Sequence, residues 1–408
     1  MLKERFSVKT GIRARMALVT IILIANAFVW YFYAFDILKQ IVNDTGLNDF
    51  ESLMVWATNF CGAAVSAFIG AAVSTRLKRR LSFLFIWMLF GLFSSLAPIV
   101  FQNMNIAGVL IISLLFGISF GFGMPACMGY YADSTTTENR ARLGGLTFLF
   151  IGLGVFLLGI IAITDLTART LILAIWRGLG LLIILLKPSE KVLERTTEKS
   201  FLSILRARSF ILYFIPWWMF CLVNYASTPV IVNFFREDFV RISTLIEGVL
   251  AGLFSVIGGS LSDIVGRKRV IITGFTMLGL GYAVLGTFPE NSFSWYFYTV
   301  VDGIAWGVFH TLFLITLWGD LAYGAPSEKY YALGGLPFLL SNFLRLVIGS
   351  YIVEAVSVYT VFSLASFFLF LAVLPLMYAP ETLPEKKIRE RELKGYIDKA
   401  KKVKEKYT

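Results

Sequence analysis

Long apolar runs alternate with short polar segments along the whole chain. A helix needs about 20 mostly apolar residues to cross a membrane, because each residue adds about 1.5 Å to a path of ~30 Å. Twelve runs are long enough, and we predict that each forms a membrane-spanning helix. The expected ranges are 16–37, 52–74, 81–101, 106–130, 143–163, 168–187, 209–235, 242–262, 270–288, 293–318, 334–355 and 358–379.

The composition agrees with this pattern. Of the 408 residues, 57% are hydrophobic and 15% are charged, which is too apolar for a soluble domain to cover its core with polar surface. The three cysteines, Cys61, Cys127 and Cys221, lie far apart within apolar runs, and His310 is the one histidine. This spacing predicts neither a disulfide framework nor a metal site, so we expect no cofactor.

Lys and Arg are concentrated at alternate ends of the predicted spans. With the N-terminus inside, 31 of the 37 basic residues lie on the cytoplasmic side and 4 on the other side. Because basic residues favour the cytoplasmic side, we expect both termini there, in a multi-pass protein of the plasma membrane. The net charge of +11 comes from these loops, so the partner it predicts is the lipid bilayer and not nucleic acid.

Two short sequences recur at nearly the same offset. Residues 140–149 and 330–339 share Leu-Gly-Gly-Leu at a separation of 190, and the basic segments 74–80 and 262–269 are 188 to 189 residues apart. Two matches at one offset predict two related six-helix bundles. The expected division is an N-terminal bundle at 1–187, a cytoplasmic linker at 188–208, a C-terminal bundle at 209–379 and a basic cytoplasmic tail at 380–408.

A parallel repeat of this kind places a solute site near the membrane midplane, between two halves that rock around it. No Walker motif is present, so the sequence favours a secondary transporter over a pump. A membrane transferase is a second interpretation, but it calls for clustered catalytic side chains near an interface, and we predict no enzymatic activity. A receptor that binds a solute without moving it is a third, since it would use the same cavity.

The loop between spans eight and nine carries a longer motif. Residues 259–268 read Gly-Ser-Leu-Ser-Asp-Ile-Val-Gly-Arg-Lys. This segment resembles the loop signature of the major facilitator superfamily, and the resemblance extends over all twelve spans. It implies an all-α membrane protein with twelve transmembrane helices in two six-helix bundles related by a pseudo-twofold axis.

The resemblance also implies a gating latch on the cytoplasmic side. Gly266 allows a tight turn, Arg267 stays on the cytoplasmic side, and Asp263 is expected to dock at the positive start of span five. Arg140, at the same end of span five, belongs to this latch. The first half departs from the signature, with Thr75 where the aspartate belongs, so its own latch is expected to differ.

Four fragments are similar to the sugar porter and metabolite:proton symporter group. They imply a monomeric transporter that takes up a small polar organic solute, a sugar or a carboxylate, by proton symport. Export or antiport by the same fold is the alternative. The group's arginine on span four is replaced by Ser113, and span five lacks the proline expected of proton antiporters. The fragments are Asp133-x-x-Thr136-x-x-x-Arg140, Trp176-Arg177, Pro380-Glu381-Thr382 and Phe32-x-x-Phe35-Asp36.

Span ten offers the main candidate transport residues. Asp302, Trp306 and His310 recur every four residues and so line one stripe of the helix. An ionisable group within a span is a functional candidate by default, and we predict that Asp302 binds and releases a proton. His310 is a second proton candidate. The alternative for Asp302 is a fixed hydrogen bond or a pair with Arg345.

Other intramembrane polar residues extend the predicted substrate and proton cavity. Arg345 in span eleven is expected either to bind an acidic group of the substrate or to pair with Asp302 or Glu247. Asp36 ends span one and is either a proton site or a solvated helix end. Asn224 lies five residues before a proline that frees a backbone carbonyl near the cavity.

Three further features carry predictions that concern packing more than transport. The Gly303-x-x-x-Gly307 pair lets a neighbouring helix approach closely. Arg177, in the peripheral span six, is expected to extend toward lipid headgroups, or to mark the outer start of a shifted span, rather than to bind substrate. Asn59 and Glu247 hold matching places in the two halves, and they predict either an outer vestibule or ordinary interhelical hydrogen bonds.

Overall fold

The computed structural model describes residues 2–77, 80–101, 105–160, 163–185, 198–235 and 237–383, and every regular element in these ranges is a helix. The first half contains α1 (Leu2–Asp44), α2 (Asp49–Ser74), α3 (Arg80–Ser95), α4 (Ala97–Val100), α5 (Ile106–Gly121), α6 (Met124–Ser134), α7 (Arg140–Ile160) and α8 (Leu166–Ile184). The second half contains α9 (Phe201–Leu205), α10 (Arg208–Phe234), α11 (Glu237–Val265), α12 (Arg267–Thr287), α13 (Ser292–Phe309), η1 (His310–Thr316), α14 (Leu317–Ala322), α15 (Glu328–Ala355) and α16 (Val358–Tyr378).

Within the described residues, twelve helical segments are long and apolar enough to cross a membrane, and they match the twelve predicted spans one for one. The prediction of an all-α, twelve-helix membrane fold is therefore confirmed. The largest difference is in α1, which continues to Asp44 instead of ending near residue 37. Residues 38–44 contain no helix breaker, and the chain turns at Gly46, whose φ of 61° suits glycine.

Two spans are interrupted in ways that the sequence pattern did not predict. Span four divides between α5 and α6, and Pro125 lies in the first turn of α6. Proline has no backbone N–H, and at the first turn of a helix this costs no intrahelical hydrogen bond. Span ten divides into α13, η1 and α14, and η1 is a π-helix that begins at His310. The apolar pattern of the sequence does not indicate such an interruption, because the residues on both sides of it are apolar. Short π segments often occur at functional sites.

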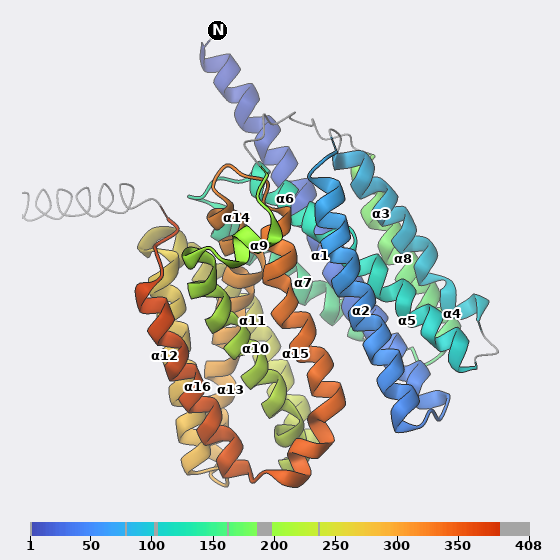
Figure 1. The fold of residues 1–408 in the computed structure, drawn as a ribbon, viewed down its shortest axis with the longest axis vertical. Helices are drawn as coiled ribbons and strands as arrows, with labels where there is room; N and C mark the ends of the chain where they lie inside the picture. Colours follow the sequence, from blue (N-terminus) through green and yellow to red (C-terminus); the bar gives the residue numbers. More distant parts are fainter. Residues whose placement is uncertain are drawn as a thin grey trace, which may run out of the picture.

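The two halves lie side by side and come closest at the end that carries α9 and α14 (Figure 1). In the first half α2 packs on α5 and α3 on α8, and in the second half α11 packs on α13 and α12 on α16. Between the halves, α7 packs on α11 and α2 packs on α15. These helices are spans five and eight in the first contact and spans eleven and two in the second. Each contact therefore turns into the other when every span is replaced by its counterpart six spans away. The packing therefore has the predicted pseudo-twofold relation.

Glycines allow the closest helix contacts. A Cβ atom on Gly307 would lie 2.4 Å from the Ala251 carbonyl oxygen, and one on Gly303 would lie 3.0 Å from the Cα of Glu247. The prediction that this glycine pair admits a neighbouring helix is confirmed, and the neighbour is α11. Between the halves, a Cβ on Gly145 would lie 2.1 Å from the carbonyl oxygen of Ser255.

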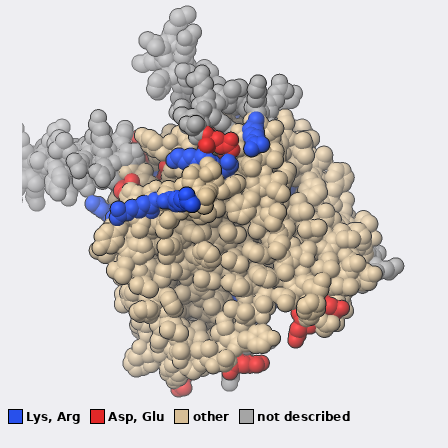
Figure 2. Space-filling view, in the orientation of Figure 1, with Lys and Arg blue, Asp and Glu red and all other residues tan. Residues whose placement is uncertain are grey.

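The connection between the halves is described from residue 198 onward and includes the short helix α9. Residues 188–197 of the predicted linker and 384–408 of the predicted tail lie outside the described residues. Figure 2 shows Lys and Arg gathered at the end of the molecule that carries α9 and α14. At the opposite end of this face the coloured side chains are Asp and Glu.

Candidate functional site

The predicted contact of Asp263 with span five is present. Its carboxylate accepts hydrogen bonds from the backbone amides of Ala141, at 3.3 Å, and Arg142, at 2.8 Å. These amides belong to the first turn of α7, where the helix dipole and the unpaired N–H groups favour an anion. Asp263 ends α11 in the second half, so this contact ties the two halves together.

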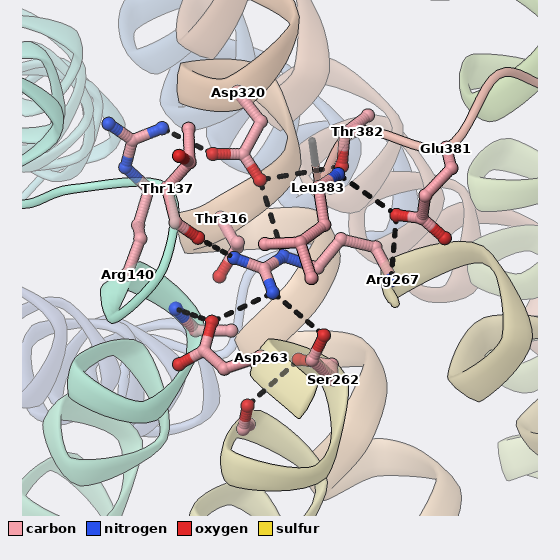
Figure 3. A network of polar contacts seen from close by, with 12 residues as sticks. Thr137, Arg140, Ser262, Asp263, Arg267, Thr316, Asp320, Glu381, Thr382 and Leu383 are labelled. Atoms are coloured by element: carbon pink, nitrogen blue, oxygen red, sulfur yellow. Dashed lines mark hydrogen bonds and ion pairs between the residues drawn. The ribbon is translucent and has the colours of Figure 1, made fainter. Parts of the chain in front are cut away.

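Arg267 lies at the centre of the same network and is fully buried (Figure 3). Its guanidinium lies 2.7 Å from Asp263 and 3.3 Å from Asp320, and it donates to the carbonyl oxygen of Ser262 at 2.8 Å. It also donates to the carbonyl oxygen of Thr137, in the first half, at 2.5 Å. Arg267 thus contacts both halves. Its position in a loop suggests an arginine in contact with water, but the side chain is fully buried.

Asp320 is the carboxylate that joins the two arginines of the latch. It forms an ion pair with Arg140 of α7 and accepts a hydrogen bond from Thr382 at 3.4 Å. Arg140 also donates to the carbonyl oxygen of Ala132 at 2.7 Å and to the hydroxyl of Thr135 at 3.1 Å. Because Asp320 comes from α14 in the second half, its pair with Arg140 holds the halves together at this end.

Gly266 makes the turn that places Arg267. Its φ of 106° favours glycine, and a Cβ atom there would lie 2.5 Å from a carboxylate oxygen of Glu381. That carboxylate accepts hydrogen bonds from the amides of Arg267, at 2.9 Å, and Lys268, at 3.1 Å, and so caps the start of α12. The Pro-Glu-Thr fragment noticed in the sequence therefore contributes to the same network.

A second polar cluster crosses between the halves at this end. Arg80 of α3 forms an ion pair with Asp133 and contacts Glu328 of α15 at 2.5 Å. Glu328 is fully buried. Thr75, which replaces the signature aspartate in the first half, instead donates to Glu198 at 2.9 Å. The polar contacts of the first half at this end therefore differ from those around Asp263, and they include the pair of Arg80 with Glu328.

Asp302 lies in a cavity of about 120 Å³ between α10, α11 and α13, all in the second half. The side chain is 3% exposed, and its Oδ1 atom has no hydrogen-bond partner among the described residues. Glu247 lines the same cavity, as do Asn224 and Trp306, whereas none of the lining residues is Lys, Arg or His. The cavity therefore holds two carboxylates without a basic side chain.

Hydroxyl and amide groups continue from this cavity into the second half. Tyr282 on α12 and Tyr298 on α13 lie within hydrogen-bond distance through their hydroxyls, at 3.0 Å. The Tyr282 hydroxyl also donates to the side-chain oxygen of Asn224 at 3.2 Å. The amide group of Asn224 donates to the carbonyl oxygen of Phe220 at 3.1 Å. These bonds fix the side of α10 that faces Asp302.

His310 is not part of the Asp302 cavity. Its ring lies 4.6 Å from the ring of Trp306 and stacks on Phe148 of α7 at 4.9 Å. Its Nε2 atom has no hydrogen-bond partner among the described residues. The predicted stripe is thus divided, with Asp302 and Trp306 in the cavity and His310 at the contact between the halves, where the π-helix starts.

Arg345 and Asp36 also lie apart from the Asp302 cavity. The guanidinium of Arg345 lies 5.4 Å from the ring centre of Tyr225, and the described residues include no carboxylate within ion-pair distance of it. Asp36 is 63% exposed and pairs with Arg169 within the first half. The prediction that Asp36 ends its helix is wrong, because α1 continues for two more turns.

The prediction for Arg177 is also wrong. Its side chain is fully buried and lies between the rings of Trp30, at 5.1 Å, and Trp87, at 4.5 Å. None of its three guanidinium nitrogens has a hydrogen-bond partner among the described residues. The small residue Gly91 makes room for it, since a Cβ atom there would lie 2.4 Å from the Arg177 Nε. Arg177 therefore packs inside the first half and does not reach the lipid headgroups.

The space between the halves is mainly apolar. A cavity of about 60 Å³ lies there, with Phe28, Met128, Leu314 and Phe338 among its walls. Asn59 lines a smaller cavity between the halves, opposite Asn342 of α15, and its amide donates to the carbonyl oxygen of Ser113 at 3.0 Å. It forms the interhelical hydrogen bond that was one of its two predicted roles.

A family model described as Major Facilitator Superfamily matches residues 240–405. The match begins at the start of α11 and covers most of the second half. No curated protein matches the sequence.

Solved structures of transporters share the fold over almost the whole chain. The proton:xylose symporter XylE matches with a TM-score of 0.71 and 16% identity, over 91% of this chain and 97% of the symporter. A bacterial homologue of the iron transporter ferroportin, in an outward-facing state, matches at 0.69 and 13%, over 90% and 98%. The human organic anion transporter MFSD10 matches at 0.64 and 15%, over 89% and 99%. At these identities the likeness concerns the fold.

Proposed function

We propose that the chain is a member of the Major Facilitator Superfamily and that it moves a small polar organic solute by alternating access. Two observations support this proposal: the family model matches residues 240–405, and almost the whole chain has the fold of solved transporters. The family and the neighbouring structures indicate transport rather than enzymatic catalysis. The two six-helix halves are the moving bodies, and the solute binds between or within them.

The observation that carries the proposal is the separation between the charged latch and the acidic cavity. The buried ion pairs that cross between the halves, Arg140 with Asp320 and Arg80 with Glu328, lie at the end we assign to the cytoplasm. The Asp302 cavity includes Phe239 and Trp295. Both residues lie near the starts of their helices, α11 and α13, whereas the latch residues Asp263 and Asp320 lie at the far ends of the same spans. A gate closed at one end and a binding cavity toward the other are the requirements of an outward-facing carrier.

We assign the charged end to the cytoplasm because the basic residues concentrate there, and for the same reason we propose that both termini lie on the cytoplasmic side of the plasma membrane. We further propose that transport is coupled to protons through Asp302, a buried carboxyl group with one unpaired oxygen. An anionic solute would meet the charges of Asp302 and Glu247 in this cavity. We therefore favour an uncharged or cationic polar solute over a carboxylate.

Uptake by purified protein in liposomes tests this function. A labelled panel of sugars, amines, amino acids and organic acids is offered with and without an inward proton gradient. We expect accumulation of one class that depends on the gradient. Asp302→Asn should lose gradient-driven accumulation, whereas Glu354→Gln, on the exposed end of α15, should behave as the parent.

Accumulation by Asp302→Asn equal to that of the parent would remove Asp302 from the coupling mechanism. Accumulation under an outward gradient would favour the exporter or antiporter alternative. Binding without any flux would favour a receptor and would refute the transport proposal.

A further inference from the structure

We propose that the Asp302 cavity binds a small organic cation, a protonated amine or a quaternary ammonium group, between the carboxylates of Asp302 and Glu247. This inference rests on the proposed function and names the class of its substrate. It starts from the charges of the cavity. Two carboxylates line it, no lining residue is basic, and the Oδ1 atom of Asp302 has no partner among the described residues.

A buried carboxylate without a counter-ion, such as that of Asp302 beside the half-buried Glu247, is costly, because the low-dielectric surroundings replace little of the hydration that it loses. Arg345 does not relieve this cost, since it does not line the cavity and lies over the ring of Tyr225. A cationic ligand would supply the missing charge and the missing hydrogen-bond donor at Asp302. The cavity of about 120 Å³ has room for several non-hydrogen atoms.

Aromatic rings make up much of the remaining wall. Phe239, Trp295, Tyr298 and Trp306 all line the cavity. Aromatic faces attract cations through their quadrupole, most strongly in tryptophan, and clusters of such rings with a carboxylate are typical of sites for alkylammonium groups. The hydroxyl and amide groups of the cavity, such as Asn224, can bind the polar part of the same ligand.

The same cavity suits a metal ion poorly. Divalent cations of the calcium and magnesium type require about six oxygen ligands, and transition metals prefer histidine or cysteine. Among the described residues no group of three or more His, Cys, Asp and Glu side chains could hold a metal. Two carboxylates surrounded by aromatic rings therefore favour an organic cation.

A proton and the cation would compete for these carboxylates. The titratable groups that face Asp302 are Glu247 from α11, Tyr298 from α13 and Tyr282 from α12, while α10 contributes the neutral Asn224. Protonation of either carboxylate removes a negative charge that would otherwise attract the cation. Cation binding should therefore weaken as the pH falls.

Equilibrium dialysis of the purified full chain with radiolabelled choline tests the site. We expect saturable binding, which 3,3-dimethyl-1-butanol, the uncharged carbon analogue of choline, does not displace. Asp302→Asn and Glu247→Gln should each weaken choline binding at least tenfold. Trp306→Leu keeps both charges and should weaken it several-fold, and Glu354→Gln should leave it unchanged. Thermal unfolding of each variant identifies those that fail to fold.

The inference is overturned if the parent binds no choline, if the uncharged analogue displaces it equally well, or if both carboxylate variants bind it like the parent. Displacement of choline by lower concentrations of Mn²⁺ would assign the pair to a metal and also overturn it. Choline counterflow in liposomes separates the two proposals. Binding without counterflow refutes transport and leaves this site, whereas flux of a neutral sugar without choline binding refutes the site and leaves transport.

Discussion

Asp320 is the residue whose loss should open the proposed gate at the latch end of the molecule. It is buried in α14 of the second half and accepts the guanidinium of Arg140 from the first half, as well as that of Arg267. Asp320→Asn keeps the shape of the side chain and removes its charge. The two arginines then remain enclosed at this end, and Arg140 loses the carboxylate that neutralises it.

The size of the effect follows from the burial of the partners. Arg140 is 6% exposed and Arg267 is fully enclosed, so neither charge can be rehydrated while the gate stays closed. Breaking a buried ion pair by removing one partner costs about 3–5 kcal/mol. Arg267 keeps Asp263, so we take the lower figure, and about 3 kcal/mol corresponds to roughly a hundredfold shift away from the closed gate.

Distances between spin labels across the gate measure this shift. Leu77 and Tyr323 lie at the latch ends of opposite halves and are 38% and 89% exposed, so both should tolerate a labelled cysteine in a background without Cys61. We expect one short distance in the parent and a longer, dominant one in Asp320→Asn. Asp165→Asn, which keeps an exposed helix cap at the other end, should match the parent. Equal distance distributions in Asp320→Asn and the parent would refute the reasoning.

Two further predictions concern the same end of the molecule. Gly145→Ala should lower the melting temperature and hinder closure, because its Cβ would lie 2.1 Å from the Ser255 carbonyl, whereas Gly152→Ala, with nothing within 4 Å, should do neither. The ammonium of Lys329 and a hydroxyl group lower the pKa of Glu198. The stabilisation from that pair is therefore present above the ordinary pKa of a glutamate and is lost as the pH falls through the lowered one, which a melting series in acid should detect as a small decrease that Glu198→Gln abolishes.

The fold was predictable because the bilayer imposes a length on every span. Twelve apolar runs and a repeat offset near 190 predict the number of helices and their pairing between the halves. The ends of helices were less predictable. Residues 38–44 are polar enough to look like a loop, yet α1 includes them, since a helix that leaves the membrane needs only water for its outer turns.

The site was only partly predictable, because the partners of a buried charge come from distant parts of the chain. Asp320 and Glu328 follow span ten as ordinary loop carboxylates in the sequence, and only the folded chain places them beside Arg140 and Arg80. The prediction for Arg177 failed because its surroundings also come from distant parts of the chain. Its position on a peripheral helix suggested contact with lipid headgroups, whereas Gly91, Trp30 and Trp87 enclose its side chain within the first half.

Two spans, eight and ten, each carry one acidic residue in the Asp302 cavity and another in the latch. On α11, Glu247 lines the cavity and Asp263 lies sixteen residues later in the latch, about 24 Å away along a straight helix. Span ten carries Asp302 in the cavity and Asp320 in the latch, with the π-helix between them. A packed helix moves largely as a rigid body, so a ligand that draws the cavity ends together must also displace the latch ends. Since η1 is the one irregular segment between Asp302 and Asp320, it is where span ten can absorb the difference between the two arrangements.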